Sequence, residues 1–244
     1  MSLKGKTVLV TGSSRGLGKA IALAFAAKGA KVAINYRKSV DEANEVVKEI
    51  KDMGGEVLLI QANIGDPAQV KSLIDQITAK WGQLDVLVNN AGITSQDRFA
   101  DIAMDRWNMI VGVNLHGTAY CAHAVLPQMI ARNSGVIINM SSILATRIQY
   151  SVVYGATKAA IERFTTGLAR ELRKSNISVC CMKPYFSKTE VVTGFLDGKV
   201  DTSDWEEPEM WGKYCTDMAE RDPAVTTGKI FDQTLCKETF GQWK

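Results

Sequence analysis

The chain is poor in histidine and cysteine, residues that often bind transition metals: its 244 residues include two histidines and five cysteines. His116 and His123 have no cysteine or aspartate partner at ligand spacing, so we predict that the protein holds no metal. Cys180 and Cys181 are adjacent inside an apolar run. We interpret all five cysteines as reduced structural thiols, which is typical of a cytoplasmic protein.

An excess of one charge sign and a long hydrophobic run are also missing. Lysine and arginine total 29, aspartate and glutamate total 26, and the net charge is +3. This balance gives no reason to expect nucleic acid or an anionic membrane as a partner. The longest apolar run, residues 20–27, is too short to span a bilayer. The first residues, MSLKGKTVLV, lack a signal-peptide core with a cleavage site, so we expect a cytoplasmic location.

Linkers, repeats and low-complexity segments are absent as well, and we interpret residues 1–244 as a single domain. A strand and a helix alternate six times, which indicates an α/β fold with a doubly wound, mainly parallel sheet and helices on both faces. The ligand crevice of such a sheet lies at the carboxyl ends of the strands. The predicted strands are residues 7–10, 31–34, 56–60, 85–88, 135–140 and 177–182.

The alternating pattern stops after residue 189. Residues 190–222 mix glycine, proline and tryptophan, which favours a segment that covers the substrate rather than a second domain. Trp205, Trp211 and Tyr214 either line an apolar substrate pocket or fix this covering segment. A last strand is predicted within residues 225–232.

A glycine-rich turn, TGSSRGLG at residues 11–18, joins the first predicted strand to the first helix. Gly12 permits a tight turn, Gly16 lets a pyrophosphate approach the backbone, and Gly18 lets the helix and strand pack closely. The helix that follows presents free N–H groups and the positive end of its dipole. This arrangement predicts a nucleotide phosphate site, with the spacing G-x-x-x-G-x-G rather than the commoner G-x-G-x-x-G.

Tyr154 and Lys158, in the segment YGATK, are four residues apart on a predicted helix and therefore share one of its faces. A tyrosine hydroxyl has an ordinary pKa of about 10, and a nearby ammonium group lowers that pKa because it stabilises the phenolate. We expect Tyr154 to act as an acid in reduction and as a base in oxidation. A Tyr-x-x-x-Lys pair is a weak signal alone, so the surrounding motifs decide its meaning.

Four further motifs accompany this pair: the glycine turn, NNAG at residues 89–92, Asn114 in VGVNLHG, and Ser141-Ser142. The combination resembles the short-chain dehydrogenase/reductase family, in register from about residue 5 to residue 189. The resemblance implies a Rossmann-like fold, a nicotinamide cofactor, and hydride transfer between that cofactor and a carbonyl or alcohol. It also implies that Lys158 bonds the nicotinamide ribose and that Asn114 marks a helix irregularity whose carbonyl holds a proton-relay water.

A serine is expected to hold the carbonyl oxygen of the substrate, and two adjacent serines are candidates. Ser142 matches the second serine of the family's pair, but it is 12 residues before Tyr154, one fewer than the family pattern; Ser141 is 13 residues before it. Because side chains alternate along a strand, only one of the two points into the site. We favour Ser142, and the predicted catalytic set is then Asn114, Ser142, Tyr154 and Lys158.

The resemblance places cofactor contacts at the ends of the third and fourth strands. Asn90, Ala91 and Gly92 are expected to flank the adenine ribose and to hold the sheet. Asn63 and Ile64 are expected at the adenine, where the family often has aspartate in place of Asn63. The asparagine oxygen can still accept a hydrogen bond from an amino group.

The end of the sixth strand departs from the family pattern. Tyr185 follows Pro184 where the family usually has glycine, so we expect it to narrow the substrate side. Thr189 is expected to contact the carboxamide of the cofactor. The complete predicted set of cofactor contacts is Gly12, Ser14, Arg15, Gly16, Leu17, Gly18, Tyr36, Arg37, Asn63, Ile64, Asn90, Ala91, Gly92, Tyr154, Lys158, Pro184 and Thr189.

The end of the second strand predicts which nicotinamide cofactor binds. NAD-specific folds place an acid there to hold the ribose hydroxyls, but residues 35–38 read NYRK, with no acid before Asp41. Arg37 is placed to bind a 2′-phosphate, and Arg15 in the glycine turn can reach the same phosphate from the other side. The sequence therefore predicts that NADP(H) is preferred over NAD(H).

We therefore predict an NADP(H)-dependent oxidoreductase that reduces a ketone or aldehyde and is reversible as an alcohol dehydrogenase. The alternatives within this class are a 3-oxoacyl-[acyl-carrier-protein] reductase, which Lys183, Lys188 and Lys199 would suit, and a sugar dehydrogenase. A non-catalytic NADP(H)-binding regulator is the alternative from another class. The expected partners are a small-molecule carbonyl or alcohol substrate and further copies of the chain in a dimer or tetramer.

Overall fold

The computed structural model describes residues 2–147, 151–188 and 205–241. Seven strands form one sheet in the order β3-β2-β1-β4-β5-β6-β7, and every neighbouring pair is parallel. The strands are β1 (Thr7–Val10), β2 (Lys31–Tyr36), β3 (Val57–Gln61), β4 (Val86–Asn89), β5 (Gly135–Met140), β6 (Ile177–Met182) and β7 (Ile230–Phe231). The predicted α/β fold with a doubly wound parallel sheet is confirmed.

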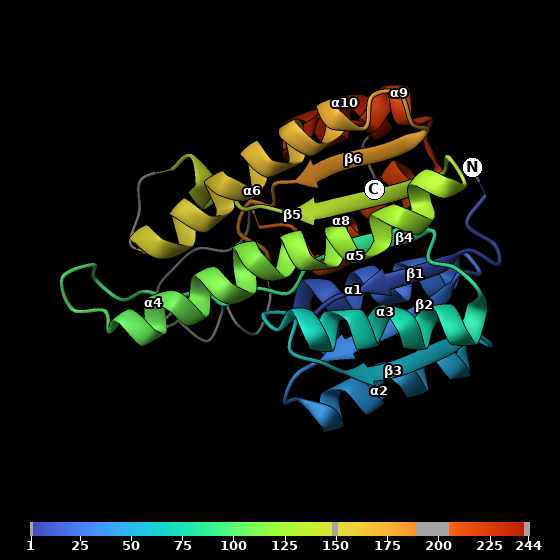
Figure 1. Cartoon of the computed structure of the whole chain (residues 1–244), viewed down its shortest axis with the longest axis horizontal. Helices are drawn as coiled ribbons and strands as arrows, with labels where there is room; N and C mark the ends of the chain where they lie inside the picture. Colours follow the sequence, from blue (N-terminus) through green and yellow to red (C-terminus); the bar gives the residue numbers. More distant parts are fainter. Residues whose placement is uncertain (1, 148–150, 189–204, 242–244) are drawn as a thin grey trace.

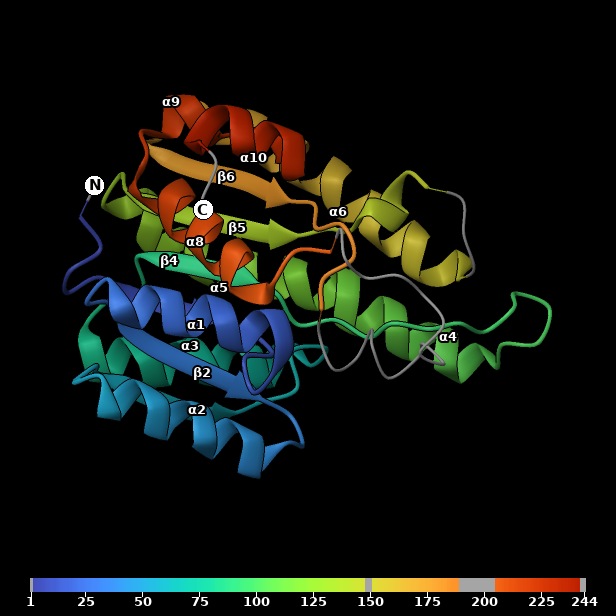
Figure 2. The same cartoon turned by 180° about the vertical axis from the view of Figure 1, so that it is seen from behind.

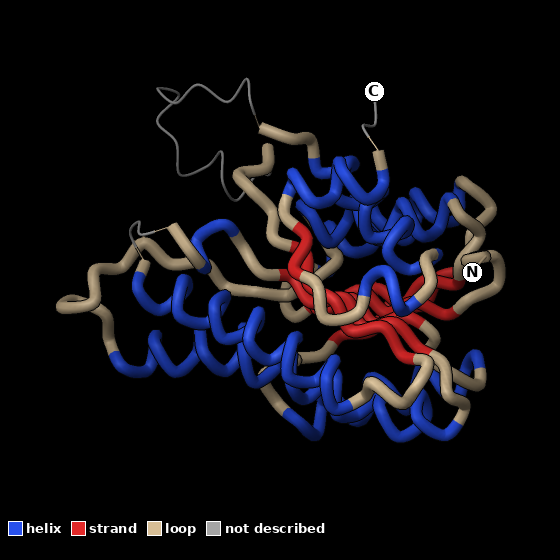
Figure 3. The backbone as a smooth tube through the Cα atoms, turned by 90° about the horizontal axis from the view of Figure 1, so that it is seen from above, coloured by secondary structure: helices blue, strands red, loops and turns tan. Residues whose placement is uncertain are grey.

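Helices cover both faces of this sheet, with the strands forming the middle layer (Figure 3). Side chains alternate along each strand, so Val8 and Val10 enter the core on one face and Leu9 enters the core on the other. The helices are α1 (Gly16–Ala27), α2 (Val40–Asp52), α3 (Pro67–Trp81), α4 (Met104–Val111), the π-helix η1 (Gly112–His116), α5 (Gly117–Ala131), the 3₁₀ turn η2 (Ile143–Ala145), α6 (Val152–Glu171), α8 (Pro208–Glu220), α9 (Pro223–Thr226) and α10 (Gln233–Phe240).

The helix α8 corrects the interpretation of residues 190–222. Trp211 and Tyr214 are fully buried in the core, and α8 packs beside α1 on one face of the sheet (Figure 2). A Cβ atom on Gly212 would lie 2.7 Å from the carbonyl oxygen of Ala20, so the two helices approach closely. Residues 208–220 are therefore part of the core, and the predicted covering role is limited to the segment before them, which lies mostly outside the described residues.

The sequence of α8 contains a helical pattern, although the alternation of strands and helices has ended before this segment. Its buried residues Trp211, Tyr214, Cys215, Met218 and Ala219 follow the i, i+3, i+4, i+7, i+8 spacing of an amphipathic helix. Proline also stands at its first position, where a missing N–H costs nothing. A window that starts at residue 208 thus predicts this helix from the sequence alone.

The helix α4, η1 and α5 form one continuous helical run, Met104–Ala131. Within the described residues it is the segment that is long and apolar enough to cross a membrane by length and composition. Its inner-face residues Cys121, Val125 and Met129 are fully buried against the sheet. We therefore interpret its apolar character as that of a core helix. In Figure 1 its α4 end and the start of α6 project beyond the arrowheads of β5 and β6.

Candidate active site

The site lies where the strand order reverses. Strands β1 and β4 are neighbours, yet the chain leaves β1 toward β2 on one side and leaves β4 toward β5 on the other. Loops that diverge from adjacent carboxyl ends leave a crevice between them, which is where doubly wound sheets bind nucleotides. The glycine turn and the NNAG segment both follow these two strands.

The glycine turn needs glycine for two measurable reasons. Gly12 and Gly16 have positive φ angles of 62° and 56°, a region that favours glycine. A Cβ atom on Gly12 would lie 2.8 Å from the Cα atom of Ala91, and a Cβ atom on Gly18 would lie 2.4 Å from the carbonyl oxygen of Gly12. The turn therefore packs against the start of α1 and against the chain that leaves β4, as the sequence predicts for Gly18.

Two buried polar side chains, Asn35 and Thr11, hold this turn. Asn35 Oδ1 accepts a hydrogen bond from the Gly12 N–H at 3.2 Å, and Asn35 Nδ2 donates to the Ala62 carbonyl at 3.1 Å. Thr11 Oγ1 accepts from the N–H groups of Asn90 and Ala91, both at 3.0 Å. Asn35 and Thr11 are not among the site residues predicted from the sequence. The signal for Asn35 is an amide residue at the end of an otherwise apolar strand.

Asn90 links the chain after β4 to the glycine turn. Its Nδ2 donates to the carbonyl oxygens of Thr11 at 2.9 Å and Gly12 at 3.1 Å. Gly92 lies elsewhere: a Cβ atom on it would meet Asn114 Oδ1 at 3.5 Å and Lys158 Nζ at 3.7 Å. The structure therefore places Gly92 beside Asn114 and Lys158, and the NNAG segment joins the glycine turn to them.

The N-terminus of α1 is open to a phosphate group. Arg15 occupies the N-cap position without a side-chain capping bond, and the first turn contains no acidic residue. By contrast, Asp66 caps α3 by accepting bonds from the N–H groups of Ala68 and Gln69. Free N–H groups, the helix dipole and a glycine turn together suit an anion. The residues at this position fit the pyrophosphate of a dinucleotide.

Tyr154 and Lys158 share one face of α6, as their spacing predicts. Lys158 Nζ lies 5.5 Å from the centre of the Tyr154 ring and donates a hydrogen bond to the Met140 carbonyl at 2.6 Å. Burial lowers the pKa of Lys158 from 10.5 to about 8. This ammonium group thus lies in the interior, directed at the end of β5.

The sequence predicts that Lys158 lowers the pKa of Tyr154, and the structure contradicts this prediction. Burial raises the pKa of Tyr154 above its ordinary value, and a hydrogen bond with Ser142 offsets part of this increase. Desolvation of the phenolate is therefore the dominant effect on the pKa of Tyr154. Tyr154 therefore stays protonated at neutral pH and is available as a proton donor.

The two adjacent serines have different environments. Ser141 is buried, and its Oγ lies 2.8 Å from Glu162 Oε1 and 3.2 Å from the Lys158 carbonyl. Ser142 Oγ is half-buried, accepts from the Leu144 N–H at 3.2 Å and bonds Tyr154. The alternation of side chains thus directs Ser142 toward Tyr154 and Ser141 toward the packing side of α6.

Asn114 lies in the π-helix η1, so the irregularity that the resemblance implies is present. Its side chain is fully buried: Oδ1 accepts from the Ile93 N–H at 2.7 Å, and Nδ2 donates to Thr157 Oγ1 at 3.1 Å. Its carbonyl oxygen accepts a hydrogen bond from Thr118 Oγ1 at 2.8 Å. Asn114 therefore connects the chain after β4 to α6, one residue before Lys158.

The residues predicted for the adenine end lie at the ends of β2 and β3. Arg15 and Arg37 are exposed, and Arg37 and Asn63 line one hollow of about 180 Å³ together with Gly112 of η1. Asn63 Oδ1 accepts a bond from the Gly65 N–H at 3.2 Å. The side chain of Ile64 is instead buried in the core against Gly117, so only its backbone remains free for a ligand.

Other predicted cofactor contacts occupy the borders of the crevice. Ser14 and Leu17 are half-buried in and just after the glycine turn, and Tyr36 is half-buried at the end of β2. The Pro184 carbonyl accepts a hydrogen bond from the Ile143 N–H at 2.8 Å, which holds the loops after β5 and β6 together. Thr189 lies outside the described residues.

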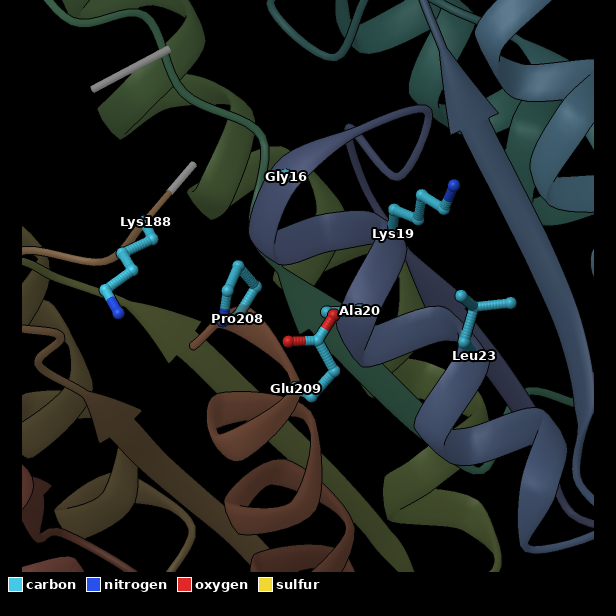
Figure 4. A pocket seen from close by; sticks show the side chains of 7 residues that line it. All are labelled: Gly16, Lys19, Ala20, Leu23, Lys188, Pro208 and Glu209. Atoms are coloured by element: carbon cyan, nitrogen blue, oxygen red, sulfur yellow. The ribbon is translucent and has the colours of Figure 1, made fainter. Parts of the chain in front are cut away.

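A second hollow adjoins the glycine turn. It measures about 170 Å³ and is lined by Gly16 and Lys19 of α1, by Lys188 and by the first residues of α8. Figure 4 shows Lys188 and Glu209 with Pro208 between them, beside the first turns of α1. Lys188 Nζ pairs with Glu207 at 2.8 Å. Among the described residues no group of histidine, cysteine, aspartate or glutamate side chains could hold a metal ion.

The fold and this site define a dinucleotide-dependent oxidoreductase, and comparison with known proteins supplies the family. Residues 6–199 match the family model described as short chain dehydrogenase. The chain belongs to the short-chain dehydrogenase family, whose members are oxidoreductases that act on CH–OH or carbonyl groups with a nicotinamide cofactor.

Individual relatives agree with this assignment. The chain is 40% identical over 193 residues to the 3-oxoacyl-[acyl-carrier-protein] reductase FabG of Staphylococcus aureus, covering 79% of this chain and 78% of the relative. A Burkholderia cenocepacia short chain dehydrogenase in complex with NADP is 31% identical with a TM-score of 0.85, over 95% of this chain and 97% of the other. A blue fluorescent protein from a metagenomic library in complex with NADPH is 30% identical with a TM-score of 0.88, over 96% and 98%.

Proposed function

We propose that the protein is an NADPH-dependent reductase of a ketone or aldehyde, reversible as an alcohol dehydrogenase. The observation that carries this proposal is the convergence of Ser142, Tyr154 and Lys158 at the end of β5, beside a glycine turn that fits a pyrophosphate. A hydroxyl pair next to a buried ammonium group suits proton transfer to a carbonyl oxygen. A regulator that only bound the dinucleotide would not need this pair.

The catalytic residues divide the work of reduction. Ser142 Oγ donates a hydrogen bond to the carbonyl oxygen of the substrate, and Tyr154 gives its hydroxyl proton to the same oxygen. Lys158 stabilises the phenolate that remains on Tyr154. Asn114 bonds both Ile93, in the chain after β4, and Thr157 of α6, and so fixes these two segments relative to each other. The nicotinamide, when bound, supplies the hydride for the carbonyl carbon.

The preference for NADP(H) rests on the charge around the adenine end. Arg37 follows β2, and Asn35 and Tyr36 stand where an NAD-specific site has an acid. Arg15 is exposed in the glycine turn, directly before Gly16. Both guanidinium groups can form charge-assisted bonds to a 2′-phosphate, which NAD(H) lacks. The 31% identical Burkholderia structure with NADP supports the same preference.

The test is a screen of carbonyl compounds that follows NADPH absorbance, with kcat/KM compared for NADPH and NADH. We expect the Arg15→Ala/Arg37→Ala variant to lose about 10- to 100-fold in kcat/KM for NADPH and little for NADH, because the two exposed charged bonds together contribute roughly 1.4–2.7 kcal/mol. A wild type that prefers NADH, or a double variant that keeps its NADPH preference, would refute the cofactor assignment.

A second candidate substrate is a 3-oxoacyl group carried on an acyl-carrier protein. The observation that favours it is the 40% identity to a protein named 3-oxoacyl-[acyl-carrier-protein] reductase. A 3-oxoacyl thioester included in the screen separates it from a simple ketone or a sugar. Efficient reduction of the thioester alone would select this candidate.

We further propose that the enzyme is cytoplasmic and acts as a homodimer or homotetramer. The apolar side chains of Met104 and Val152 are 57% and 56% exposed at the starts of α4 and α6, two helices that pack against each other, which supports contact with further copies. Light scattering at several concentrations gives the number of subunits. A monomer at all concentrations would contradict this proposal.

A further inference from the structure

A partly buried ion pair lies one helical turn beyond Lys158 and is not used by the proposed reaction. Glu162 Oε1 is 3.2 Å from Nζ of Lys183, the residue after β6, and their side chains are 19% and 11% exposed. The pair Lys71–Asp75 on α3 is by comparison 76% and 62% exposed. Two charges taken out of water gain little net stability from their own attraction, so this pair has another role.

Glu162 connects three elements at the catalytic turn of α6. Its Oε1 accepts a hydrogen bond from Ser141 Oγ at 2.8 Å, at the end of β5. The Ser141 Oγ also lies 3.2 Å from the Lys158 carbonyl, and the Ser141 N–H donates to the Met182 carbonyl of β6 at 2.7 Å. The carboxylate therefore ties the turn that carries Lys158 to the ends of both strands.

The same face of α6 carries Tyr154, Lys158 and Glu162 at intervals of four residues. The charges of Glu162 and Lys158 both act on the pKa of the Cys181 thiol in β6, so both groups lie near this thiol. Burial raises the pKa of this thiol to about 12, which keeps it uncharged. The elements that pack against α6 place six side chains near this face. They are Cys181 and Lys183 at β6, Ser141 at β5, Ser142 at η2, Asn114 of η1 and the apolar Ile110 of α4.

We propose that Glu162 and Lys183 are a positioning pair, which sets the catalytic turn of α6 over β5 and β6 and surrounds Tyr154 and Lys158 with no net charge. The inference rests on the proposed function only in calling this turn catalytic. Each partner cancels the charge of the other, so the pair fixes geometry without biasing proton transfer. Removal of one partner would leave a charge close to that turn.

The signs of the two single substitutions are opposite. Glu162→Gln leaves the positive charge of Lys183, which favours the phenolate of Tyr154 and the neutral form of Lys158, so both pKa values fall. Lys183→Met leaves the negative charge of Glu162, so both pKa values rise. The double variant removes both charges and restores the balance. A purely structural contact has no such dependence on sign.

The experiment is an NMR titration of the full-length enzyme that carries ¹³C-labelled tyrosine and lysine, with the signals assigned through Tyr154→Phe and Lys158→Met. We expect the Tyr154 midpoint to move down by about half a pH unit or more in Glu162→Gln and up by a similar amount in Lys183→Met. The double variant should titrate as the wild type does. Asp75→Asn, in the exposed pair on α3, is the matched control and should shift nothing.

Shifts of both single variants in one direction, or lower melting temperatures without shifts, would overturn the proposal. If a single variant does not fold, the double variant and Lys183→Arg test the proposal instead. Tyr154 should titrate in both as it does in the wild type, and a displaced Tyr154 midpoint in either variant would refute the positioning role of the pair. The titration needs no substrate. Opposite shifts in an enzyme that reduces no carbonyl compound would therefore support the positioning pair and refute the proposed function.

Discussion

The cofactor half of the site and its catalytic half are built by different means. At the ends of β1 and β4, Gly12 and Gly18 allow backbone segments to pack in direct contact. The side chain of Asn35 holds the glycine turn through hydrogen bonds to the Gly12 N–H and the Ala62 carbonyl. At the ends of β5 and β6, the proposed catalytic groups are side chains of α6: Tyr154, which is half-buried, and Lys158, which is buried. A phosphate needs free N–H groups and space, whereas proton transfer needs particular side chains with shifted pKa values.

This difference predicts that the two halves fail in different ways. A substitution in the catalytic half should reduce turnover and leave cofactor affinity nearly intact. A substitution in the cofactor half should weaken binding because it displaces the backbone.

Tyr154→Phe should have the largest effect, a loss of kcat on the order of 10³-fold, because it removes the proton donor. The Kd for NADPH should change little, since the ring and its packing remain. Steady-state kinetics and a fluorescence titration of NADPH measure the two quantities. Wild-type turnover in this variant would contradict the assignment of Tyr154.

Ser142→Ala should lower kcat by about 10²-fold, as expected when a hydrogen bond to a developing oxyanion is lost. Ser141→Ala should lower kcat far less, because its hydroxyl bonds Glu162 and the Lys158 carbonyl instead. It should reduce the free energy of unfolding by about 1–3 kcal/mol, because polar groups are left unpaired. The opposite order of kcat values would exchange the roles of the two serines.

Gly18→Ala should break the cofactor half. The new Cβ atom would lie 2.4 Å from the Gly12 carbonyl oxygen and 2.5 Å from Asn90 Nδ2, so the turn must shift. We expect the Kd for NADPH to rise about tenfold and the free energy of unfolding to fall by about 1–3 kcal/mol. Gly167→Ala in α6, where a Cβ atom meets nothing within 4 Å, is the matched control. Unchanged NADPH affinity in Gly18→Ala would contradict the model of a backbone-built site.

The smallest effect concerns stability and pH. Burial lowers the pKa of Lys158 from 10.5 to about 8, so between these values the unfolded chain binds a proton that the folded chain does not. The free energy of unfolding therefore rises with pH in this window. Urea unfolding should show that wild type gains about 1–3 kcal/mol more than Lys158→Met between pH 8 and 10.5. Lys71→Met, an exposed lysine on α3, is the control; parallel curves for wild type and Lys158→Met would contradict the shift.

The sequence by itself determines the doubly wound sheet, because strands buried on both faces are continuous apolar runs and the helices between them have their own period. The structure has β1, β5 and β6 with the predicted bounds. Strand β2 continues to Tyr36, two residues beyond the prediction. The prediction stops at Ile34 because the polar Asn35 ends the apolar run, but the backbone of Asn35 and Tyr36 still pairs with β3. The glycine turn and the shared face of Tyr154 and Lys158 are also local properties.

Only the tertiary structure decides what depends on neighbours that are distant in the sequence. It directs Ser142 toward Tyr154 and Ser141 toward Glu162, and it encloses Tyr154 so that its pKa rises where the local Tyr–Lys spacing predicts a fall. It also draws α8 into the core beside α1, although 180 or more residues separate these helices. Periodicity describes one element at a time, whereas burial, desolvation and partner choice arise only when several elements pack together.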